Sequence, residues 1–247
     1  MRLTNRVHLV GSGQYGFSMT CDYDCHVYLV DGGGGELALI DAGVGIEPAL
    51  ILKNIEAEGF RLQDISHILL THAHSDHAGG AQALSQATGA AVYVSELEVA
   101  PLRAGDEVAI ALDVAREAGL YPQWYRFPAC LQAKGLAEGQ KLSLGDLELV
   151  PILIPGHSEG SLCYLMEAEG VRYLFSGDVV FWRGAISLLN CRGSSLKAYR
   201  QNIGKLAELQ IDVLLPGHGA IALSRGQRHI DMALHGFRGI APPKNFL

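Results

Sequence analysis

The chain is short of basic residues and of long apolar runs, and each shortage excludes a class of protein. It carries 19 Lys and Arg against 26 Asp and Glu, which gives a formal net charge of -7. Proteins that bind nucleic acids usually present a basic face to the phosphates, so we expect no nucleic-acid partner. No stretch approaches the roughly 18 consecutive apolar residues of a membrane-spanning helix. We therefore expect no membrane association.

Cysteines are also few, and internal repeats are absent. Five cysteines in 247 residues are an odd number in a chain that is not small, which does not indicate a disulfide framework. The first residues, MRLTNRVHLV, lack the apolar core and cleavage site of a signal peptide, so we expect a cytoplasmic protein. Without repeats or a Pro/Ser linker, residues 1–247 are predicted to form a single domain. The apolar content would allow a dimer, but no motif specifies the oligomeric state.

Apolar runs and turn signals predict an ordered series of strands and helices. Strands are expected at residues 27–30, 37–40, 68–70, 91–94, 140–154 (two strands), 162–166, 171–175 and 213–215. Helices are expected at residues 48–58, 75–87, 101–119, 195–209 and 226–234. This order suits two β-sheets packed face to face with helices outside them.

Histidines carry most of the chemical information. The stretch THAHSDHAGG places His72, His74, Asp76 and His77 directly after an apolar run. Further candidates follow other apolar runs: His157 in Pro-Gly-His, Asp178 in Ser-Gly-Asp, and His218 in Pro-Gly-His-Gly. Polar loops at strand ends are common places for functional sites. The remaining histidines are expected to be surface or hydrogen-bonding residues and not metal ligands: His8, His26, His67, His229 and His235.

The residue types in these loops are those that bind divalent metals. Imidazole and carboxylate ligands suit Zn²⁺, Fe²⁺ and Mn²⁺. A His-x-His pair directs two imidazoles to one ion, while Asp76 and His77, in the turn that follows, reach a second ion. Seven candidate ligands exceed the needs of one tetrahedral ion, so two metals are expected, with zinc first and iron or manganese as alternatives. A carboxylate such as Asp178 can bridge two ions, although a single-metal site remains open.

The series Thr-His-x-His-x-Asp-His-x-Gly-Gly, Pro-Gly-His, Gly-Asp and Pro-Gly-His-Gly resembles the motifs of the metallo-β-lactamase-fold hydrolases. The resemblance implies a four-layer αββα sandwich, an α/β fold with the metal site at the edge between the two sheets. It implies that His72, His74 and His157 hold the first metal and that Asp76, His77 and His218 hold the second, with Asp178 bridging both. Asp41, in Ile-Asp-Ala-Gly, would orient a ligand histidine.

The same resemblance implies a hydrolytic mechanism. A hydroxide shared by two metals would attack a small carbonyl substrate, and Asp76 would act as a catalytic residue by passing a proton to the leaving group. We expect Phe181, Trp182 and Arg183, which follow Asp178, to contact the substrate. Gln14 to Phe17 could form a flap, and the aromatic cluster at residues 121–127 could cap the cleft.

The residue type at the bridging position, Asp178, distinguishes between the subfamilies of this superfamily. An aspartate at this position resembles the pattern of the glyoxalase II-like thioesterases, the lactonases and the phosphodiesterases. We therefore expect a thioester, ester or lactone as the small-molecule substrate. The alternatives are a β-lactam hydrolase or phosphodiesterase of the same fold, and a mononuclear iron persulfide dioxygenase. A metal-binding protein without catalytic activity is the remaining alternative.

Overall fold

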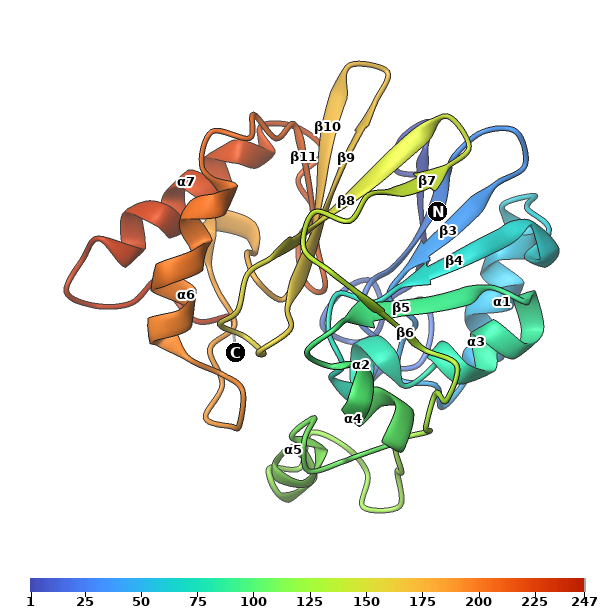
Figure 1. Cartoon of the computed structure of the whole chain (residues 1–247), viewed down its shortest axis with the longest axis horizontal. Coiled ribbons are helices and arrows are strands. Elements are labelled where there is room, and N and C mark those ends of the chain that lie inside the picture. Colours follow the sequence, from blue (N-terminus) through green and yellow to red (C-terminus); the bar gives the residue numbers. More distant parts are fainter. Residues whose placement is uncertain (247) are drawn as a thin grey trace.

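The computed structural model describes residues 1–246, which form two mixed β-sheets and the helices that cover them (Figure 1). The first sheet has the strand order β1-β2-β3-β4-β5-β6. Its strands are β1 (Val7–Gly11), β2 (Val27–Asp31), β3 (Leu37–Ile40), β4 (Ile65–Leu69), β5 (Ala91–Ser95) and β6 (Lys134–Leu136). β1, β2 and β3 pair antiparallel, whereas β3 to β6 pair parallel.

The second sheet has the order β11-β10-β9-β8-β7. Its strands are β7 (Leu142–Leu144), β8 (Leu147–Leu153), β9 (Leu162–Ala168), β10 (Val171–Gly177) and β11 (Val213–Pro216). β7 to β10 pair antiparallel, and β10 pairs parallel to β11. β8, β10 and β11 therefore run in the same direction and end at the same edge of this sheet.

Some of the helices cover the outer face of each sheet, and others lie beyond one edge of the sheets (Figure 1). The helices are α1 (Pro48–Ala57), α2 (Ser75–Ala78), α3 (Ala81–Thr88), α4 (Val99–Ala104), α5 (Leu112–Glu117), α6 (Leu196–Asn202) and α7 (Gly226–Phe237). Short 3-10 turns occur at Leu62–Asp64, Trp182–Gly184 and Ile203–Leu206. No helix among residues 1–246 has the length and apolar content required to cross a membrane.

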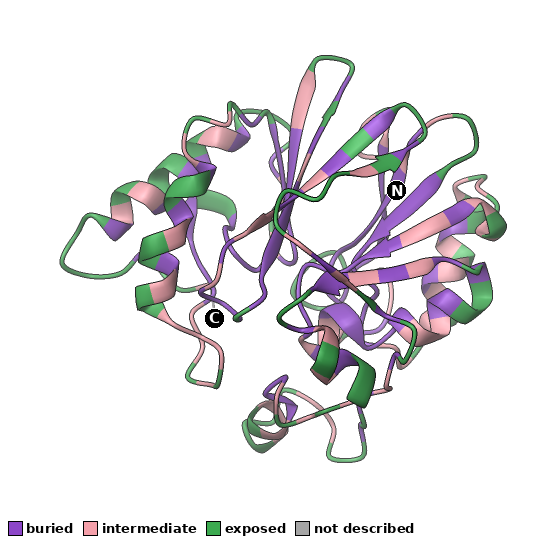
Figure 2. Ribbon diagram, in the orientation of Figure 1, coloured by how far each residue is buried: buried purple, intermediate pink, exposed green. Residues whose placement is uncertain are grey.

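Three apolar layers correspond to the three interfaces of this arrangement. The first packs α1 and α3 against the first sheet, through residues such as Ile51 and Leu84. The second lies between the sheets and includes Tyr28 and Phe175. The third packs the second sheet against α6 and α7 and includes Tyr199. Figure 2 shows the buried strands between helices whose outer faces are exposed. The predicted αββα sandwich is confirmed.

Several element boundaries differ from the sequence-based expectation. β1 and β6 were not expected, and both are edge strands of the first sheet. The helix expected at residues 75–87 is divided into α2 and α3 at Gly79 and Gly80. A Cβ atom on either glycine would overlap the backbone of the loop after β3, at Val44 and Ala42 respectively. The chain therefore needs glycine here to bring α2 close to that loop.

Candidate metal centre

The candidate ligands meet because their strands end at the same edge of the sandwich. β4 leads directly into the loop of His72 and His74. In the second sheet, β8 leads to His157, β10 to Asp178 and β11 to His218. Sites in α/β proteins commonly form beyond the carboxyl ends of strands. This topology brings together residues separated by as many as 146 positions in the sequence.

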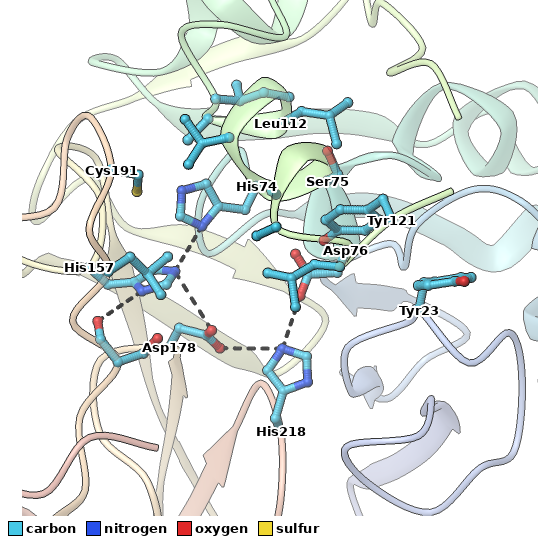
Figure 3. Close-up of a pocket in the computed structure, with 18 of the residues that line it drawn as sticks. Tyr23, His74, Ser75, Asp76, Leu112, Tyr121, His157, Asp178, Cys191 and His218 are labelled. Carbon is cyan, nitrogen blue, oxygen red and sulfur yellow. Dashed lines mark hydrogen bonds and ion pairs between the residues drawn. The ribbon is translucent and has the colours of Figure 1, made fainter. Parts of the chain in front are cut away.

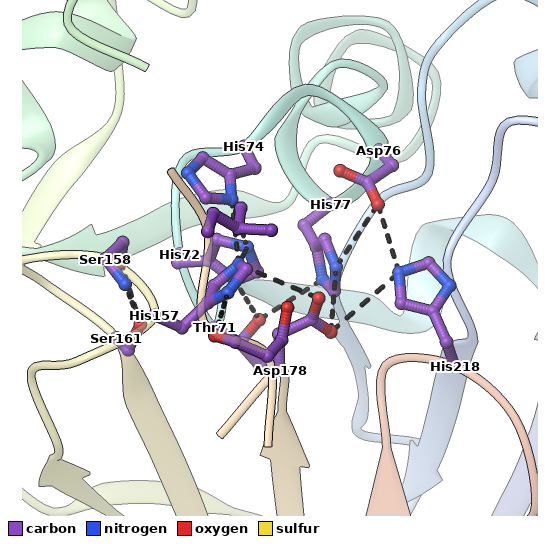
Figure 4. A network of polar contacts seen from close by, with 12 residues as sticks. Thr71, His72, His74, Asp76, His77, His157, Ser158, Ser161, Asp178 and His218 are labelled. Atoms are coloured by element: carbon purple, nitrogen blue, oxygen red, sulfur yellow. Dashed lines mark hydrogen bonds and ion pairs between the residues drawn. The ribbon is translucent and has the colours of Figure 1, made fainter. Parts of the chain in front are cut away.

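Three imidazoles form the first group of candidate ligands (Figure 4). Nδ1 of His74 lies 3.1 Å from Nε2 of His72 and 2.8 Å from Nε2 of His157, and the latter two atoms are 3.1 Å apart. Neutral imidazole binds Zn²⁺ and similar ions through a ring nitrogen that carries no proton. Three such nitrogens facing one point form a suitable trio of ligands.

Asp76, His77 and His218 form the second group. Oδ2 of Asp76 lies 3.0 Å from Nε2 of His218 and 3.6 Å from Nε2 of His77. Asp76 and His77 come from the short helix α2 that begins at Ser75. This helical turn separates their side chains from those of His72 and His74, which precede it in extended chain.

Asp178 lies between the two groups, and each of its oxygens faces a different one (Figure 4). Oδ2 is 3.6 Å from Nε2 of His157 in the first group. Oδ1 is 3.4 Å from Nε2 of His77 and 3.8 Å from Nε2 of His218 in the second. One oxygen of Asp178 is therefore directed toward each group of candidate ligands.

Two buried atoms show that the site fits divalent cations. Nε2 of His77 and Oδ1 of Asp178 are buried and have no hydrogen-bond partner among the described residues. A buried polar atom without a partner costs stability, and both atoms face the second group. A cation between them would supply the missing interaction. The donor set of imidazoles and carboxylates suits zinc, iron or manganese.

The protonation states of the first group also suit metal binding. Burial lowers the pKa of His72 well below its ordinary value, lowers that of His74 to about 3, and lowers that of His157. These imidazoles are therefore neutral near neutral pH. Burial opposes ionisation of Asp178, but His218 and His77 outweigh it and hold its pKa below the ordinary range. His77 and His218 likewise outweigh burial and lower the pKa of Asp76.

Asp41 supports the second group by contacting the Nδ1 atom of His77. Its Oδ2 lies 2.8 Å from Nδ1 of His77 and accepts a 2.9 Å hydrogen bond from the Thr71 hydroxyl. Its Oδ1 accepts a 2.7 Å bond from the Thr71 backbone N–H. A carboxylate only accepts hydrogen bonds, so Nδ1 of His77 carries the hydrogen and Nε2 is left free for a metal. Asp41 has a φ of 64°, in the left-handed region that Asp tolerates better than most residues.

Glu98 supports the first group, although no sequence motif pointed to it. This buried carboxylate follows β5 and precedes α4. Oε2 accepts a 2.7 Å hydrogen bond from the N–H of Ala73, and Oε1 accepts a 2.9 Å bond from the N–H of Gly160. It therefore ties the loop of His72 and His74 to the loop of His157. Its place at a strand end is the signal that could have identified it.

His26 supports the loop of His218 through hydrogen bonds, in keeping with the expectation that it is a hydrogen-bonding residue and not a ligand. Its Nε2 lies 2.9 Å from the carbonyl oxygen of Gly219, and its Nδ1 lies 3.0 Å from Oγ of Ser12. Its backbone N–H donates a 2.6 Å bond to the carbonyl of Gly217. These contacts attach the Pro-Gly-His-Gly loop of the second sheet to the chain segment before β2.

A cavity of about 370 Å³ opens beside the two groups of ligands. Its lining includes His74, Asp76, His157, Asp178 and His218 (Figure 3). The remainder comes from Ser75, from the early loop at Gln14, Tyr15 and Tyr23, from residues 110–121 around α5, from residues 187–191, and from Phe246. Gln14 and Tyr15 lie in the segment expected to form a flap, and Tyr121 lies in the expected aromatic cap.

The three residues expected to contact substrate lie elsewhere. Phe181 is buried and stacks on Phe246, with ring centroids 4.4 Å apart. Trp182 packs against His229 with centroids 4.2 Å apart, and the Arg183 N–H donates to Nδ1 of His229. None of the three lines the cavity, so their contact with substrate stays a prediction that the cavity does not support.

Comparison with known sequences identifies the family. Residues 22–218 match the family described as the metallo-beta-lactamase superfamily. The chain is 29% identical over 180 residues to the probable polyketide biosynthesis zinc-dependent hydrolase BaeB of Bacillus velezensis, covering 72% of this chain and 67% of the relative. It is 33% identical over 212 residues to the acyl-coenzyme A thioesterase MBLAC2 of Gallus gallus, covering 78% of this chain and 72% of the relative. It spans about half of the length of some fungal relatives.

Comparison with solved structures gives the same result. A metallo-β-lactamase of Cronobacter sakazakii with a HARLDQ motif superposes with a TM-score of 0.69 at 26% identity, covering 88% of this chain and 80% of that one. A B3 metallo-β-lactamase with an active-site glutamic acid superposes with a TM-score of 0.71 at 25% identity, covering 94% and 85%. With the sequence match over residues 22–218, these similarities place the chain in the metallo-β-lactamase superfamily, and it is a hydrolase of that superfamily.

Proposed function

We propose that the chain is a binuclear metal-dependent hydrolase that attacks the carbonyl carbon of a small thioester, ester or lactone and breaks its acyl C–S or C–O bond. The observation that carries the proposal is the position of Asp178, whose two oxygens face different groups of ligands. A single-metal enzyme, such as an iron dioxygenase, would not need both groups. The intact second group, Asp76, His77 and His218, supports the binuclear interpretation.

Two divalent ions, with zinc expected first, would supply Lewis acidity that lowers the pKa of water and polarises a carbonyl. The chain's own residues would orient the ligands and transfer the proton. Asp41 keeps the hydrogen of His77 on Nδ1. Glu98 joins the loop of His72 and His74 to the loop of His157. Asp76 is ionised near neutral pH and lines the cavity. Its Oδ2 faces His218, which leaves Oδ1 to accept a proton from the attacking water and to pass it to the departing thiolate or alkoxide.

The relatives favour thioesters among the candidate substrates. Several of them are named thioesterases, including an atrochrysone carboxyl ACP thioesterase of Aspergillus fumigatus. The structural neighbours are metallo-β-lactamases, so β-lactam hydrolysis is the second candidate. A β-lactam antibiotic usually carries a carboxylate, and no Lys or Arg lines the cavity among the described residues. This argues for the uncharged carbonyl substrate.

Metal analysis combined with a substrate panel tests the proposal. We expect two equivalents of zinc, iron or manganese per chain and hydrolysis of thioesters or esters in preference to phosphodiesters and a chromogenic β-lactam. His74→Ala and Asp178→Ala should each lower kcat/KM by more than about 100-fold, whereas His235→Ala, on α7, should not. A folded protein that retains one metal at most, or that prefers the phosphodiester or β-lactam, would contradict the proposal.

A further inference from the structure

We infer that the cavity binds an uncharged, apolar acyl chain and that residues around α5 determine how long a chain is accepted. This inference rests on the proposed function, because it takes the reacting carbonyl to lie at the metal centre. It adds the chemical class of the acyl group and the residues that select it.

The charges of the cavity exclude an anionic acyl group. Among the described residues of its lining, the acidic or basic side chains other than histidines are Asp76 and Asp178, both candidate metal ligands. A carboxylate on the acyl group would find no Lys or Arg partner among the described lining residues. Removing an unpaired charge from water is costly, so the cavity discriminates against acyl groups that end in a carboxylate.

The part of the cavity beyond His74 is apolar (Figure 3). Ile110, Leu112, Val114 and Ala115 come from α5 and the residue pair before it, and Leu189 comes from the loop that follows Ser187. Figure 3 shows Leu112 on one side of His74, with His157, Asp178 and His218 on the other. A substrate therefore meets polar ligands at one end of the cavity and aliphatic side chains at the other.

Two of the apolar residues are incompletely covered. Val114 and Leu120 both line the cavity, and each keeps 42% of its surface exposed. Large apolar side chains exposed at the edge of a cavity often mark a ligand-binding surface. An acyl chain lying against α5 would remove this surface from water and gain the corresponding hydrophobic free energy.

The size of the cavity determines which part of the substrate enters. A volume of about 370 Å³ is near the lower limit for small-molecule sites. A carrier that bears phosphates, such as a coenzyme or a carrier protein, would bring negative charges that the lining does not neutralise. The acyl chain therefore occupies the cavity, and the carrier remains at its mouth.

Ser187 adds a polar contact at the metal end. This residue is buried and lines the cavity, and its hydroxyl has no hydrogen-bond partner among the described residues. Its carbonyl oxygen lies 3.0 Å from Nδ1 of His157, which places the residue beside the first ligand group. The hydroxyl can donate to the polar end of the substrate and so favours an orientation with the aliphatic chain toward α5.

Chain-length selectivity tests the inference. With the metal-loaded protein, kcat/KM would be measured for acetyl, butanoyl, hexanoyl and succinyl thioesters of N-acetylcysteamine. Each methylene buried in the cavity should raise kcat/KM by about fourfold until the cavity is full. The succinyl thioester, which bears a carboxylate, should be the poorest substrate of the series. In Ala115→Phe, which fills the apolar part, the ratio of hexanoyl to acetyl kcat/KM should fall by at least about tenfold.

A control variant and a binding measurement separate the possible outcomes. Ala104→Phe makes the same change at an exposed position in α4 and should keep the wild-type ratio. Calorimetry with non-hydrolysable ethyl and hexyl thioethers of N-acetylcysteamine should show tighter binding of the hexyl compound, which Ala115→Phe abolishes. Equal acetyl and hexanoyl rates, or a preference for succinyl, would overturn the inference and leave the proposed function intact. If the protein hydrolyses neither these thioesters nor any ester or lactone, the proposed function is refuted, and the thioethers still decide whether the cavity accepts an alkyl chain.

Discussion

Oδ2 of Asp41 lies 2.8 Å from Nδ1 of His77, and both side chains are almost fully buried. We predict that Asp41→Asn weakens metal binding at the second ligand group, because an amide in this position no longer fixes which nitrogen of His77 is free. Loss of such a partner typically costs 10-fold to 100-fold in metal affinity. Asn tolerates the left-handed backbone of residue 41, so the fold is kept. Competition with a chromophoric chelator measures the change. Unaltered affinity for both ions would contradict this role of Asp41.

Glu98 gives a parallel prediction for the first group. In Glu98→Gln one carboxylate oxygen becomes an NH₂ group, which faces the N–H of Ala73 or of Gly160 instead of accepting from it. A buried donor without an acceptor costs about 1–3 kcal/mol. We expect a lower free energy of unfolding and preferential loss of one metal equivalent. Glu96→Gln, an exposed neighbour, is the matched control. If both variants unfold at the same denaturant concentration and bind two metals, Glu98 has no such role.

Gly217 tests how tightly the site is packed. Its φ is ordinary, so its importance lies in the space around it. A Cβ atom there would overlap Oδ1 of Asp178 and lie 2.6 Å from Cε1 of His77. We predict that Gly217→Ala displaces the bridging carboxylate and lowers both metal content and kcat/KM by at least about tenfold. Gly204→Ala, which adds a Cβ atom into open space, should leave both unchanged. Metal analysis after gel filtration measures the effect, and a normal metal content in Gly217→Ala would refute the packing argument.

The candidate ligands could be proposed from the sequence because each depends only on a local pattern, a polar residue after an apolar run. Each of the seven candidate ligands follows an apolar run, and such a run predicts where a strand ends. The supporting residues depend on contacts between distant segments. Glu98 is separated by 25 positions from Ala73 and by 62 from Gly160, so its role required the folded topology.

The apolar cavity could not be predicted for the same reason. A single helix was expected over residues 101–119, but the chain forms α4 and α5 with a bend between them. That bend places Leu112 and Val114 at the cavity, and hydrophobic periodicity alone does not reveal it. Phe181 was expected near the substrate because it follows Asp178 in sequence. Its ring instead packs on Phe246, a contact between residues 65 positions apart.

We predict that the burial of His26 makes the stability of the folded chain depend on pH. Burial lowers the pKa of His26 to about 4, whereas an unperturbed histidine has a pKa near 6.5. Between these values the unfolded chain binds a proton that the folded chain does not, so stability falls as pH decreases through this window. The contribution is complete above about pH 6.5, and roughly 2 kcal/mol is lost by about pH 5. The buried imidazoles of the first ligand group act in the same direction.

Comparison with His26→Gln isolates the contribution of this residue. Glutamine does not titrate, and its amide can reach the same partners, Ser12 and Gly219. The metal-free forms of both proteins would be unfolded with urea at about pH 7 and about pH 5. The free energy of unfolding should decrease with acid by about 2 kcal/mol less in the variant. Equal acid sensitivity of the two proteins would mean that His26 titrates in the folded chain as it does in the unfolded chain, and that its burial does not keep it neutral.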